Sequence, residues 1–485
     1  MGDGAVRAPK KTQGKRAQTP DLFVRLAAHV TLEVQPGGQV LASFHDYSIG
    51  LGTFDTSLAA RLPALRAGLP LSAVTRGGRR TDQGIDVLVR RLARRNLVEY
   101  ALRRAGGADL IAIEPQTADF WPQVVPLRSS DALALSRFAY LRRRGNDMVL
   151  ESPRSTALLR IDDPRIAGLL AKLSTPQPVG QLRREQGFPG LVFLGLLVDC
   201  QFAFKVDAKS NKSLRSAEGD GDLVVWDFHD LLFHTRSTEG RHANPLGGTY
   251  PHAGMIAPLP AVRPSWPGKK IELREVLAAQ TRKNSPIAEI LRERHSVRNF
   301  DERRPITLAE LSQFLDGAAR IVPKPEDVAA AAGEDEYAPR PYPSAGAAYE
   351  LELYLCVNSC EGLPRGFYYY DAERHALAAI DVAGNALDAS LVAAGSAMGV
   401  EAPPQILITI AARFGRISWK YSSLAYSLIL RDAGVLLQTF YLMAADLDLG
   451  GCAVGIANID LFAKMTGIEF HVEGPVGQFA LGRGA

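Results

Sequence analysis

The stretch from Leu424 to Leu447 is apolar on nearly every side of the helix that it predicts. It is long enough to span a membrane, but Arg431, Asp432 and Gln438 interrupt it, which favours a buried helix of a soluble protein. A helix that is apolar all round needs neighbours on every side. One domain offers too little cover, so we expect this helix at the centre of a homodimer.

The composition predicts a folded protein of several domains with no membrane segment. Its 485 residues correspond to about three domains of average size. With 46% hydrophobic and 22% charged residues, a mainly disordered or membrane-embedded chain is excluded. The net charge of +4 is too small for a dedicated nucleic-acid-binding protein. Four scattered cysteines without metal or disulfide spacing fit the reducing cytoplasm.

The N-terminal half predicts two small modules of similar design. Residues 23–102 read as a hairpin around Pro36–Gly38, helices over 56–67 and 84–95, and a strand over 97–102. This is the element order of a winged-helix module. Residues 148–207 repeat it at an offset of about 105 residues.

The helix over 84–95 carries arginines on one face and apolar residues on the other. Three interpretations of this cationic face stay open: a solvated surface, a site for an acidic peptide, and a site for DNA phosphates. The arginines are Arg90, Arg91, Arg94 and Arg95.

Four of the nine histidines lie close together in the middle of the chain, which raises the question of a metal. They are His229, His234, His242 and His252. Their spacing matches no standard zinc pattern and no cysteine is near, so we expect no metal site.

A polar cluster follows the helix that Ser285 and Pro286 begin. Two guanidiniums and a hydroxyl within five residues can give forked, charge-assisted hydrogen bonds to a phosphate. The cluster consists of Arg294, His295, Ser296 and Arg298.

A turn of small residues comes next, after a helix that the capping-box pattern Thr307 to Glu310 begins. Small residues let the backbone approach a flat ligand closely, and the alternating strand over 351–357 supports the turn. The turn consists of Pro343, Ser344, Ala345 and Gly346.

These C-terminal motifs resemble those of the nitroreductase-like FMN flavoproteins, and more narrowly the SagB-type azoline dehydrogenases, which make thiazoles and oxazoles in ribosomal peptides. Upstream, WDFHDLLFHTRSTEGRH and GGTYPH are similar to the segment that precedes the flavin domain in that branch. The resemblance covers about 200 residues and rests on RHSVRNF, PYPSAGAAYELELYL, GFYYYD, SWKYSSLAYSLILRDAGVLLQ and LGGCAVG.

The resemblance implies an FMN site shared by two chains. It places the phosphate and ribityl chain near the cluster of Arg294, His295, Ser296 and Arg298. It places the isoalloxazine against the turn of Pro343, Ser344, Ala345 and Gly346. Gly450 and Gly451 would approach the flavin from another strand, and Arg483 would add a basic contact.

The resemblance also implies that Lys420 and Tyr421 are the catalytic pair. Aromatising an azoline removes a proton from Cα and a hydride from the neighbouring carbon, which flavin N5 accepts. A lysine acts as the base near neutrality only where a desolvated or cationic site lowers its pKa, and a tyrosine hydroxyl can steer the proton. The substrate would be a heterocyclised precursor peptide, with a cyclodehydratase as a partner.

The sequence therefore predicts an α+β chain with two N-terminal winged-helix-like modules and a C-terminal nitroreductase-like FMN domain. The expected parts are a disordered tail (1–20), a peptide-binding module (21–106), a second module (135–207), a linker and extended arm (208–284) and the FMN domain (285–485).

Two other functions compete with azoline oxidation. An NAD(P)H-dependent nitro or quinone reductase would not need Lys420. A DNA-binding or scaffold protein with a vestigial flavin fold would use the arginine-rich helix, against the small net charge.

Overall fold

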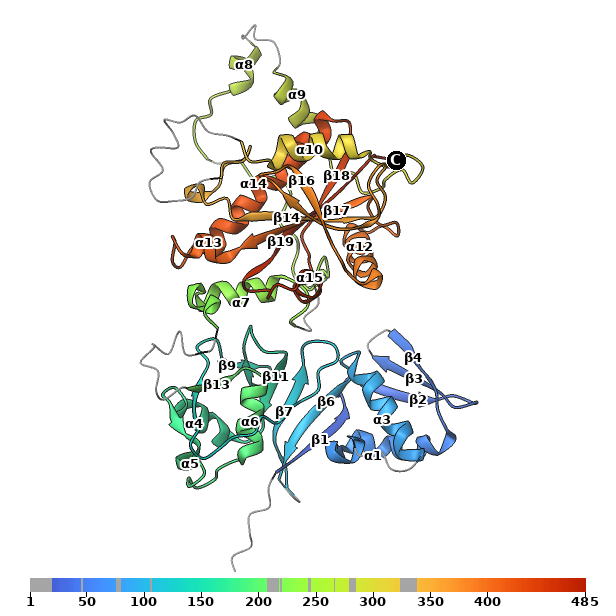
Figure 1. Cartoon of the computed structure of the whole chain (residues 1–485), viewed down its shortest axis with the longest axis vertical. Helices are drawn as coiled ribbons and strands as arrows, with labels where there is room; N and C mark the ends of the chain where they lie inside the picture. The colour runs from blue at the N-terminus through green and yellow to red at the C-terminus, as the bar shows by residue number, and fades with distance from the viewer. Residues whose placement is uncertain are drawn as a thin grey trace, which may run out of the picture. The chain divides into compact units, whose positions relative to one another are not determined.

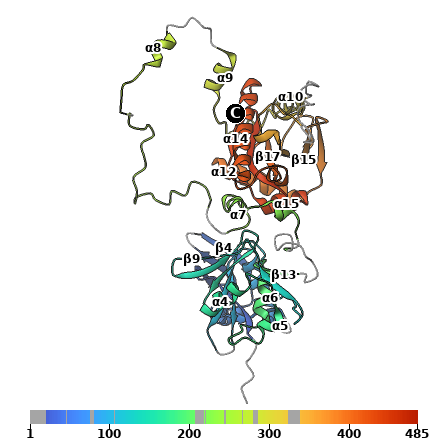
Figure 2. The same cartoon turned by 90° about the vertical axis from the view of Figure 1, so that its left-hand side faces the viewer.

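The computed structural model describes residues 20–44, 47–75, 80–104, 107–206, 218, 220–242, 246–265, 267–278, 285–322 and 338–485. The chain forms two compact units, Met1–Gly219 and Asp220–Ala485 (Figures 1 and 2). The tail expected over 1–20 lies outside the described residues except for Pro20, as do residues 208–217, 219, 243–245, 266 and 279–284 of the linker and arm expected over 208–284.

The first unit contains the same strand order twice. In one half, β1 (Asp21–Leu26) lies between β5 (Leu69–Pro70) and β6 (Val98–Arg103). In the other half, β8 (Ala132–Leu135) lies between β12 (Gln177–Pro178) and β13 (Ala203–Val206). This recurrence agrees with the sequence repeat.

Each first strand is followed by three further strands and then by helices. The strands are β2 (Val30–Val34), β3 (Gln39–Phe44) and β4 (Tyr47–Thr53) in one half, and β9 (Tyr140–Arg144), β10 (Asp147–Glu151) and β11 (Ala157–Ile161) in the other. The longer helices are α1 (Leu62–Ala67), α3 (Arg80–Ala93), α4 (Pro164–Lys172) and α6 (Leu191–Asp199), and shorter ones are α2 (Leu71–Thr75) and α5 (Val179–Leu182). Strand β7 (Asp109–Pro115) pairs with β6 and with β11, so one seven-stranded sheet runs through both halves.

These elements confirm one local prediction and correct another. The hairpin is confirmed, because Val34 pairs with Val40 across the turn. The single helix expected over 56–67 is wrong: a 3-10 helix, η1 (Thr56–Arg61), precedes α1. Pro63 stands in the first turn of α1, where a residue without an N–H is tolerated, so the proline begins a new helix.

The arginines of α3 have partners inside the first unit. Arg90 pairs with Asp86 and lies over the Trp121 ring. Arg91 donates to a backbone carbonyl of β4 and lies over the Phe54 ring. These contacts favour a structural role for the face over a site for DNA phosphates.

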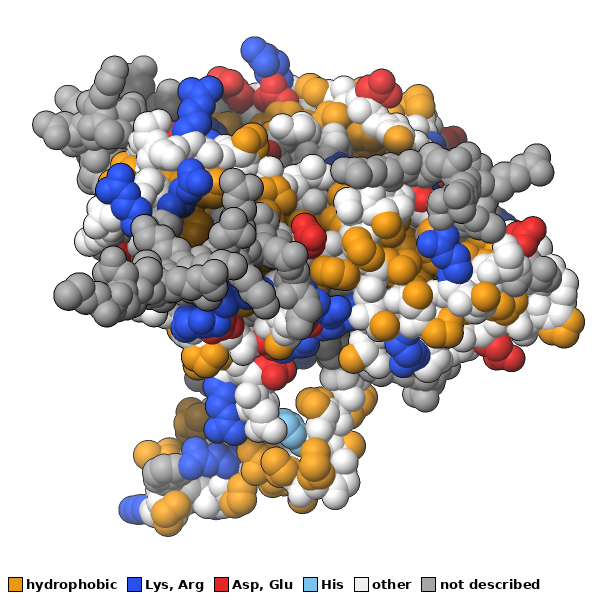
Figure 3. Space-filling view, turned by 90° about the horizontal axis from the view of Figure 1, so that it is seen from below, with side chains coloured by type: hydrophobic (Ala, Val, Ile, Leu, Met, Phe, Trp, Pro, Cys, Tyr) orange, Lys and Arg blue, Asp and Glu red, His pale blue; other side chains and the backbone are white. Residues whose placement is uncertain are grey.

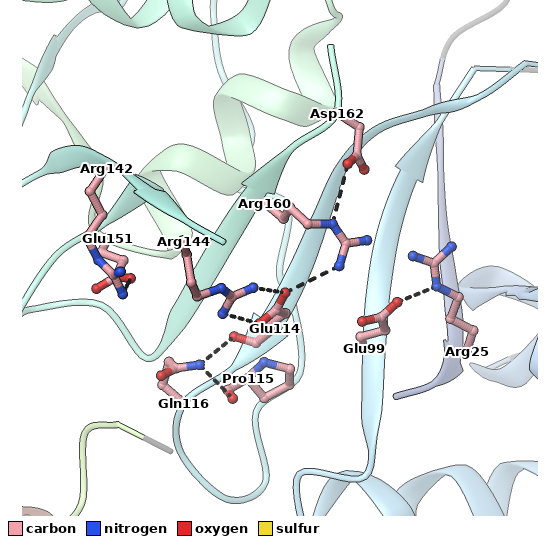
Figure 4. A network of polar contacts seen from close by, with 10 residues as sticks. All are labelled: Arg25, Glu99, Glu114, Pro115, Gln116, Arg142, Arg144, Glu151, Arg160 and Asp162. Carbon is pink, nitrogen blue, oxygen red and sulfur yellow. Dashed lines mark hydrogen bonds and ion pairs between the residues drawn. The ribbon is translucent and has the colours of Figure 1, made fainter. Parts of the chain in front are cut away.

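A second group of arginines is neutralised in the same way. Glu114 accepts two hydrogen bonds from Arg144 and one from Arg160, and Arg25 pairs with Glu99 (Figure 4). On the face drawn in Figure 3, basic side chains are scattered among acidic and apolar ones. Side chains of both charges occur on this face, which does not favour binding of a nucleic-acid backbone there.

The second unit is built on a six-stranded antiparallel sheet in the order β16-β15-β14-β17-β19-β18. Its strands are β14 (Leu351–Val357), β15 (Gly366–Asp371), β16 (Ala376–Ile380), β17 (Ile406–Arg413), β18 (Gly450–Val454) and β19 (Glu473–Gly482). All residues of β14 and nearly all of β17 are buried, because helices cover both faces of the sheet. The strand predicted over 351–357 is confirmed.

Helix α14 (Ala425–Asp446) and helix α10 (Leu308–Ala319) lie on one face of the sheet. Phe440 of α14 packs against Phe314 of α10 and Phe479 of β19, with ring centroids 5.2 and 5.4 Å apart. On the other face, α12 (Gly384–Met398) and α15 (Ile459–Thr466) form a separate core with β14 and β17. A short helix, α13 (Phe414–Ser418), precedes α14.

The long helix predicted from the sequence is therefore a core helix of the second unit. By length and composition alone α14 could cross a membrane. Asp432, however, is buried inside the unit and hydrogen-bonded, and the sheet covers one side of the helix. The described residues leave Leu424 and Val435 of this segment exposed.

Part of the stretch expected as linker and arm is packed within the second unit. It contains η3 (Asp222–Val225) and α7 (Phe228–Ser237). His234 is buried among Trp226, Phe414 and Tyr426, and burial lowers its pKa to about 3. This histidine is a core residue, and among the described residues no group of three or more His, Cys, Asp or Glu side chains is placed to hold a metal ion.

The capping box of α10 gives a direct test of this fold. The Glu310 N–H donates to the Thr307 hydroxyl, and the Thr307 N–H donates to the Glu310 carboxylate. We expect Thr307→Ala to lower the free energy of unfolding by about 1 kcal/mol, because the Glu310 N–H loses its acceptor and the Glu310 carboxylate loses the hydroxyl as a donor. Chemical unfolding measures the change. Thr307→Ser should recover most of it, and equal loss in both variants would contradict a capping role.

Candidate active site

The first group of expected cofactor residues lies where α9 (Pro286–Glu293) ends beside α14. The Arg294 guanidinium stands over the Tyr441 ring, 4.9 Å from its centroid. The Ser296 hydroxyl lies 2.9 Å from the Tyr441 hydroxyl, which accepts a hydrogen bond from the Ala453 N–H. Tyr441, which the sequence analysis missed, therefore fixes both residues against α14 and β18.

Gly450 and Gly451 of β18 lie next to the segment that contains Arg294, Ser296 and Val297. The Val297 N–H donates to the Gly451 carbonyl over 2.9 Å. A Cβ on Gly450 would lie 2.7 Å from the Val297 side chain, and one on Gly451 would lie 2.2 Å from the Phe479 ring. Both glycines are needed for close packing within this chain, whatever else approaches them.

The remaining basic residues of this group differ in whether their side chains form ion pairs. His295 and Arg298 are exposed, and Arg298 forms no ion pair with any described residue. The Arg483 guanidinium is paired with Glu310 over 2.6 Å, so its side chain is directed at the capping box of α10. Its carbonyl accepts from the Asp301 N–H, which keeps its backbone beside the segment after Arg298.

The second group is the turn from Pro343 to Gly346. Gly346 has φ 57°, which glycine adopts readily, and directly after the turn Ala347 and Tyr349 also take positive φ values, which are strained for residues with a Cβ. The Ala345 N–H donates to Asp432 Oδ2 over 2.8 Å, and the Tyr349 N–H donates to the Ser344 hydroxyl. Side chains from α14 and from the turn itself thus hold an otherwise unfavourable conformation.

Lys420 and Tyr421 both contact this turn at Gly346. Lys420 Nζ donates to the Gly346 carbonyl over 3.1 Å. A Cβ on Gly346 would lie only 2.2 Å from the Tyr421 hydroxyl, so that hydroxyl rests directly against the glycine. The catalytic pair and the isoalloxazine-binding turn expected from the sequence are brought together.

Two buried carboxyl groups lie behind the turn, and the sequence analysis missed them. Glu350 is fully buried and Asp432 is 6% exposed. The Ser344 hydroxyl lies 3.2 Å from Glu350 Oε2 and 3.0 Å from Asp432 Oδ2. An acid in the middle of an apolar helix was the one available signal, because a buried charge is retained only with hydrogen-bonding partners.

The two groups lie on opposite sides of α14. Asp432 contacts the turn and Tyr441 contacts Ser296, and these two anchors are nine residues apart. At 100° per residue they point about 180° apart around the helix. The sheet-facing residues Leu436 and Phe440 separate them. A single chain therefore presents two half-sites that do not face each other.

Neither of two cavities described for the second unit is lined by an expected site residue. One, of about 760 Å³, lies between α12, α15 and the sheet. Another, of about 440 Å³, is lined in part by Arg413, Arg416 and Trp419. Trp419, which directly precedes Lys420 in the chain, is 76% exposed and leaves an aromatic surface there.

The contact at Gly346 is testable by substitution. We expect Gly346→Ala to lower the stability by about 1–3 kcal/mol, because the new methyl group meets the Tyr421 hydroxyl and the positive φ disfavours it. Thermal unfolding and the retained flavin measure the effect. Gly434→Ala is the matched control, since no atom lies within 4 Å of that Cβ and alanine favours a helix. Equal behaviour of the two variants would contradict the close contact.

Two protein families match separate parts of the chain. Residues 133–243 match the family described as cyanobactin oxidase ThcOx, and residues 291–483 match the nitroreductase family. A protein of Methanocaldococcus jannaschii named as a nitroreductase is 34% identical over 171 residues, covering 35% of this chain and 78% of that protein.

Parts of the chain are also similar to solved structures. A crystal structure described as a nitroreductase of Ralstonia eutropha is 24% identical, with 42% of this chain and 86% of that chain covered and a TM-score of 0.33. A component of the Escherichia coli microcin synthetase McbBCD complex is 19% identical, with 57% and 99% covered and a TM-score of 0.39. From the family match over residues 291–483 and the M. jannaschii relative, the chain belongs to the nitroreductase family of oxidoreductases.

Proposed function

We propose that this enzyme oxidises thiazoline or oxazoline rings of a ribosomally made peptide to thiazoles or oxazoles, with FMN as its cofactor. The observation that carries the proposal is the meeting of Lys420 and Tyr421 at Gly346. A ring held against this turn would have a base and a phenol on one side. The match to the cyanobactin oxidase family supports a peptide as the substrate.

The chain's residues have distinct roles in this reaction. Lys420 takes the proton from Cα of the ring, and Tyr421 orients the reacting group or passes the proton on. A flavin, if bound here, would supply the acceptor for the hydride from the neighbouring carbon, with oxygen as the terminal oxidant. Lys420 is exposed in the free chain, and binding of the peptide over Trp419 would remove water from it.

Two features of the described residues fit FMN. Arg294 and Arg298 make no ion pair with any described carboxylate, which leaves guanidinium charge for a phosphate. The glycine-containing turn offers backbone to a flat ring system. The flavins of the nitroreductase family agree with this choice. Arg483, whose guanidinium pairs with Glu310, would reach the phosphate only after exchanging that partner.

Removal of the base tests the chemistry. We expect Lys420→Ala to lower the rate of azoline oxidation by about 100- to 10,000-fold, because a positioned base contributes this much. Its flavin content should stay unchanged. The measurement is the loss of about two mass units per ring by mass spectrometry, one proton and one hydride.

Lys464→Ala is the matched control, since Lys464 is an exposed lysine of α15. Full activity of Lys420→Ala, together with bleaching of the flavin by NADPH alone, would overturn the proposal in favour of a nitro or quinone reductase.

We further propose a homodimer in which each flavin lies between two chains. The opposed half-sites support it, because Ser296 of one chain can meet the Gly346 turn only of another. Uncovered apolar residues support it too. All described residues from 247 to 278 are exposed, including helix α8 (Leu273–Ala278) and Leu259, which is 92% exposed. Burial of each such side chain would be worth about 1.5–3 kcal/mol.

Mixed dimers test the shared site. Arg298→Ala and Lys420→Ala damage different half-sites, so each pure variant should be inactive. In a re-equilibrated mixture, half of the dimers carry one intact site, and activity should return to about a quarter of the wild-type value. A mixture that stays inactive while exchange of chains is verified would show that each site lies within one chain.

The N-terminal modules complete the proposal. We infer that they bind the precursor peptide, that a cyclodehydratase delivers the ring-bearing peptide, and that the enzyme works in the cytoplasm. The exposed edge strand β9 carries backbone groups that a peptide strand could pair with. The paired arginines of α3 give no support to the DNA-binding alternative.

A further inference from the structure

Glu350 and Asp432 form a carboxyl pair with no cationic partner. None of the described lysines or arginines makes an ion pair with either group. The two carboxyls are within hydrogen-bonding reach of each other, and both reach the Ser344 hydroxyl. That hydroxyl has one proton, so it can satisfy only one of them at a time. Glu350 Oε1 has no hydrogen-bond partner among the described atoms.

The groups that face the pair do not neutralise it. Asp432 comes from α14, Ser344 from the turn, and Tyr342 from the segment before the turn. The Arg413 N–H donates to the Glu350 carbonyl, while the Arg413 side chain approaches Glu352. The Arg416 guanidinium donates to the carbonyl of Ala348. The charged residues nearby are therefore used by other partners.

Two carboxylates in such a site cannot both be ionised without strong repulsion. Burial raises the pKa of Glu350 to about 7, and the charge of Asp432 adds to the increase. Near neutral pH Glu350 therefore holds a proton in a large fraction of the molecules, and the protonated acid can donate to Asp432. Asp432 remains the acceptor for the Ala345 N–H.

We propose that the proton shared by Glu350 and Asp432 is a positioning device for Lys420: it keeps the turn in the shape in which the Gly346 carbonyl receives Lys420 Nζ. The chain of contacts is continuous, from Asp432 to the Ala345 N–H, through the turn to Gly346, and on to Lys420. Loss of the proton places two negative charges behind the turn and releases it. This inference deepens the proposed azoline oxidation and rests on it for its catalytic consequence.

Glu350→Gln tests the device, because the amide keeps a donor for Asp432 but cannot titrate. The first measurement needs neither flavin nor peptide. The raised pKa means that the wild-type protein loses stability as the pH rises from about 4.5 to about 7. Glu350→Gln should lack this loss. Asp446→Asn, which removes an exposed carboxylate from the same helix, should behave like the wild type.

The second measurement is the pH profile of kcat. We expect the wild-type rate to fall about tenfold for each pH unit well above 7, and Glu350→Gln to keep its rate over that range. If Glu350→Gln does not fold, Asp432→Asn takes its place: Glu350 still titrates there, but no second negative charge faces it, so the fall in rate above pH 7 should be weaker than in the wild type. A purely structural role would give parallel profiles for wild type and variant.

The two measurements separate the two proposals. If no azoline is oxidised but the stability curves differ as described, azoline oxidation is wrong and the shared proton stands. If azolines are oxidised and the variants keep the wild-type decline above pH 7, the shared proton does not position Lys420. Parallel stability curves for Glu350→Gln and the wild type would overturn the shared proton itself.

Discussion

The packing of α14 on the sheet is the interaction on which the second unit depends. Phe440 sits between Phe314 and Phe479, and this cluster fixes both the height and the rotation of the helix. Rotation matters because Asp432 and Tyr441 leave the helix in opposite directions. Each anchors one half-site. An α14 turned by one residue would lose the turn on one side and the Arg294–Ser296 segment on the other.

Burial of polar groups on α14 has a cost that the neighbouring elements offset. Asp432 has the Ala345 N–H and the Ser344 hydroxyl as donors, and Tyr441 has the Ala453 N–H and the Ser296 hydroxyl. Ser344 and Ser296 belong to segments without regular structure, Ala345 begins a short 3-10 helix and Ala453 lies in β18. The same bonds that satisfy the helix therefore order the loops that would hold a flavin, which links stability to the site.

In the first unit, too, buried and half-buried polar groups have partners within the fold. Its many arginines are distributed over carboxylates, carbonyls and aromatic rings, as with Glu114 between Arg144 and Arg160. The helix pattern of Arg90 and Arg91 was visible in the sequence, but their partners, Trp121 and a carbonyl of β4, come from distant positions. Charge patterning alone could not show that this face is engaged internally.

The sequence by itself determined the elements and the family: the capping box at Thr307, the buried strand over 351–357, the apolar helix and the repeat of the N-terminal modules follow from local periodicity and turn chemistry. It also predicted Lys420, Tyr421 and the Gly346 turn as site residues through motifs. Only the tertiary structure decided how they combine. Glu350 and Asp432 are far apart in the chain, Arg483 is directed to Glu310, and the half-sites are opposed, because such contacts depend on strand order and helix rotation, which no local pattern encodes.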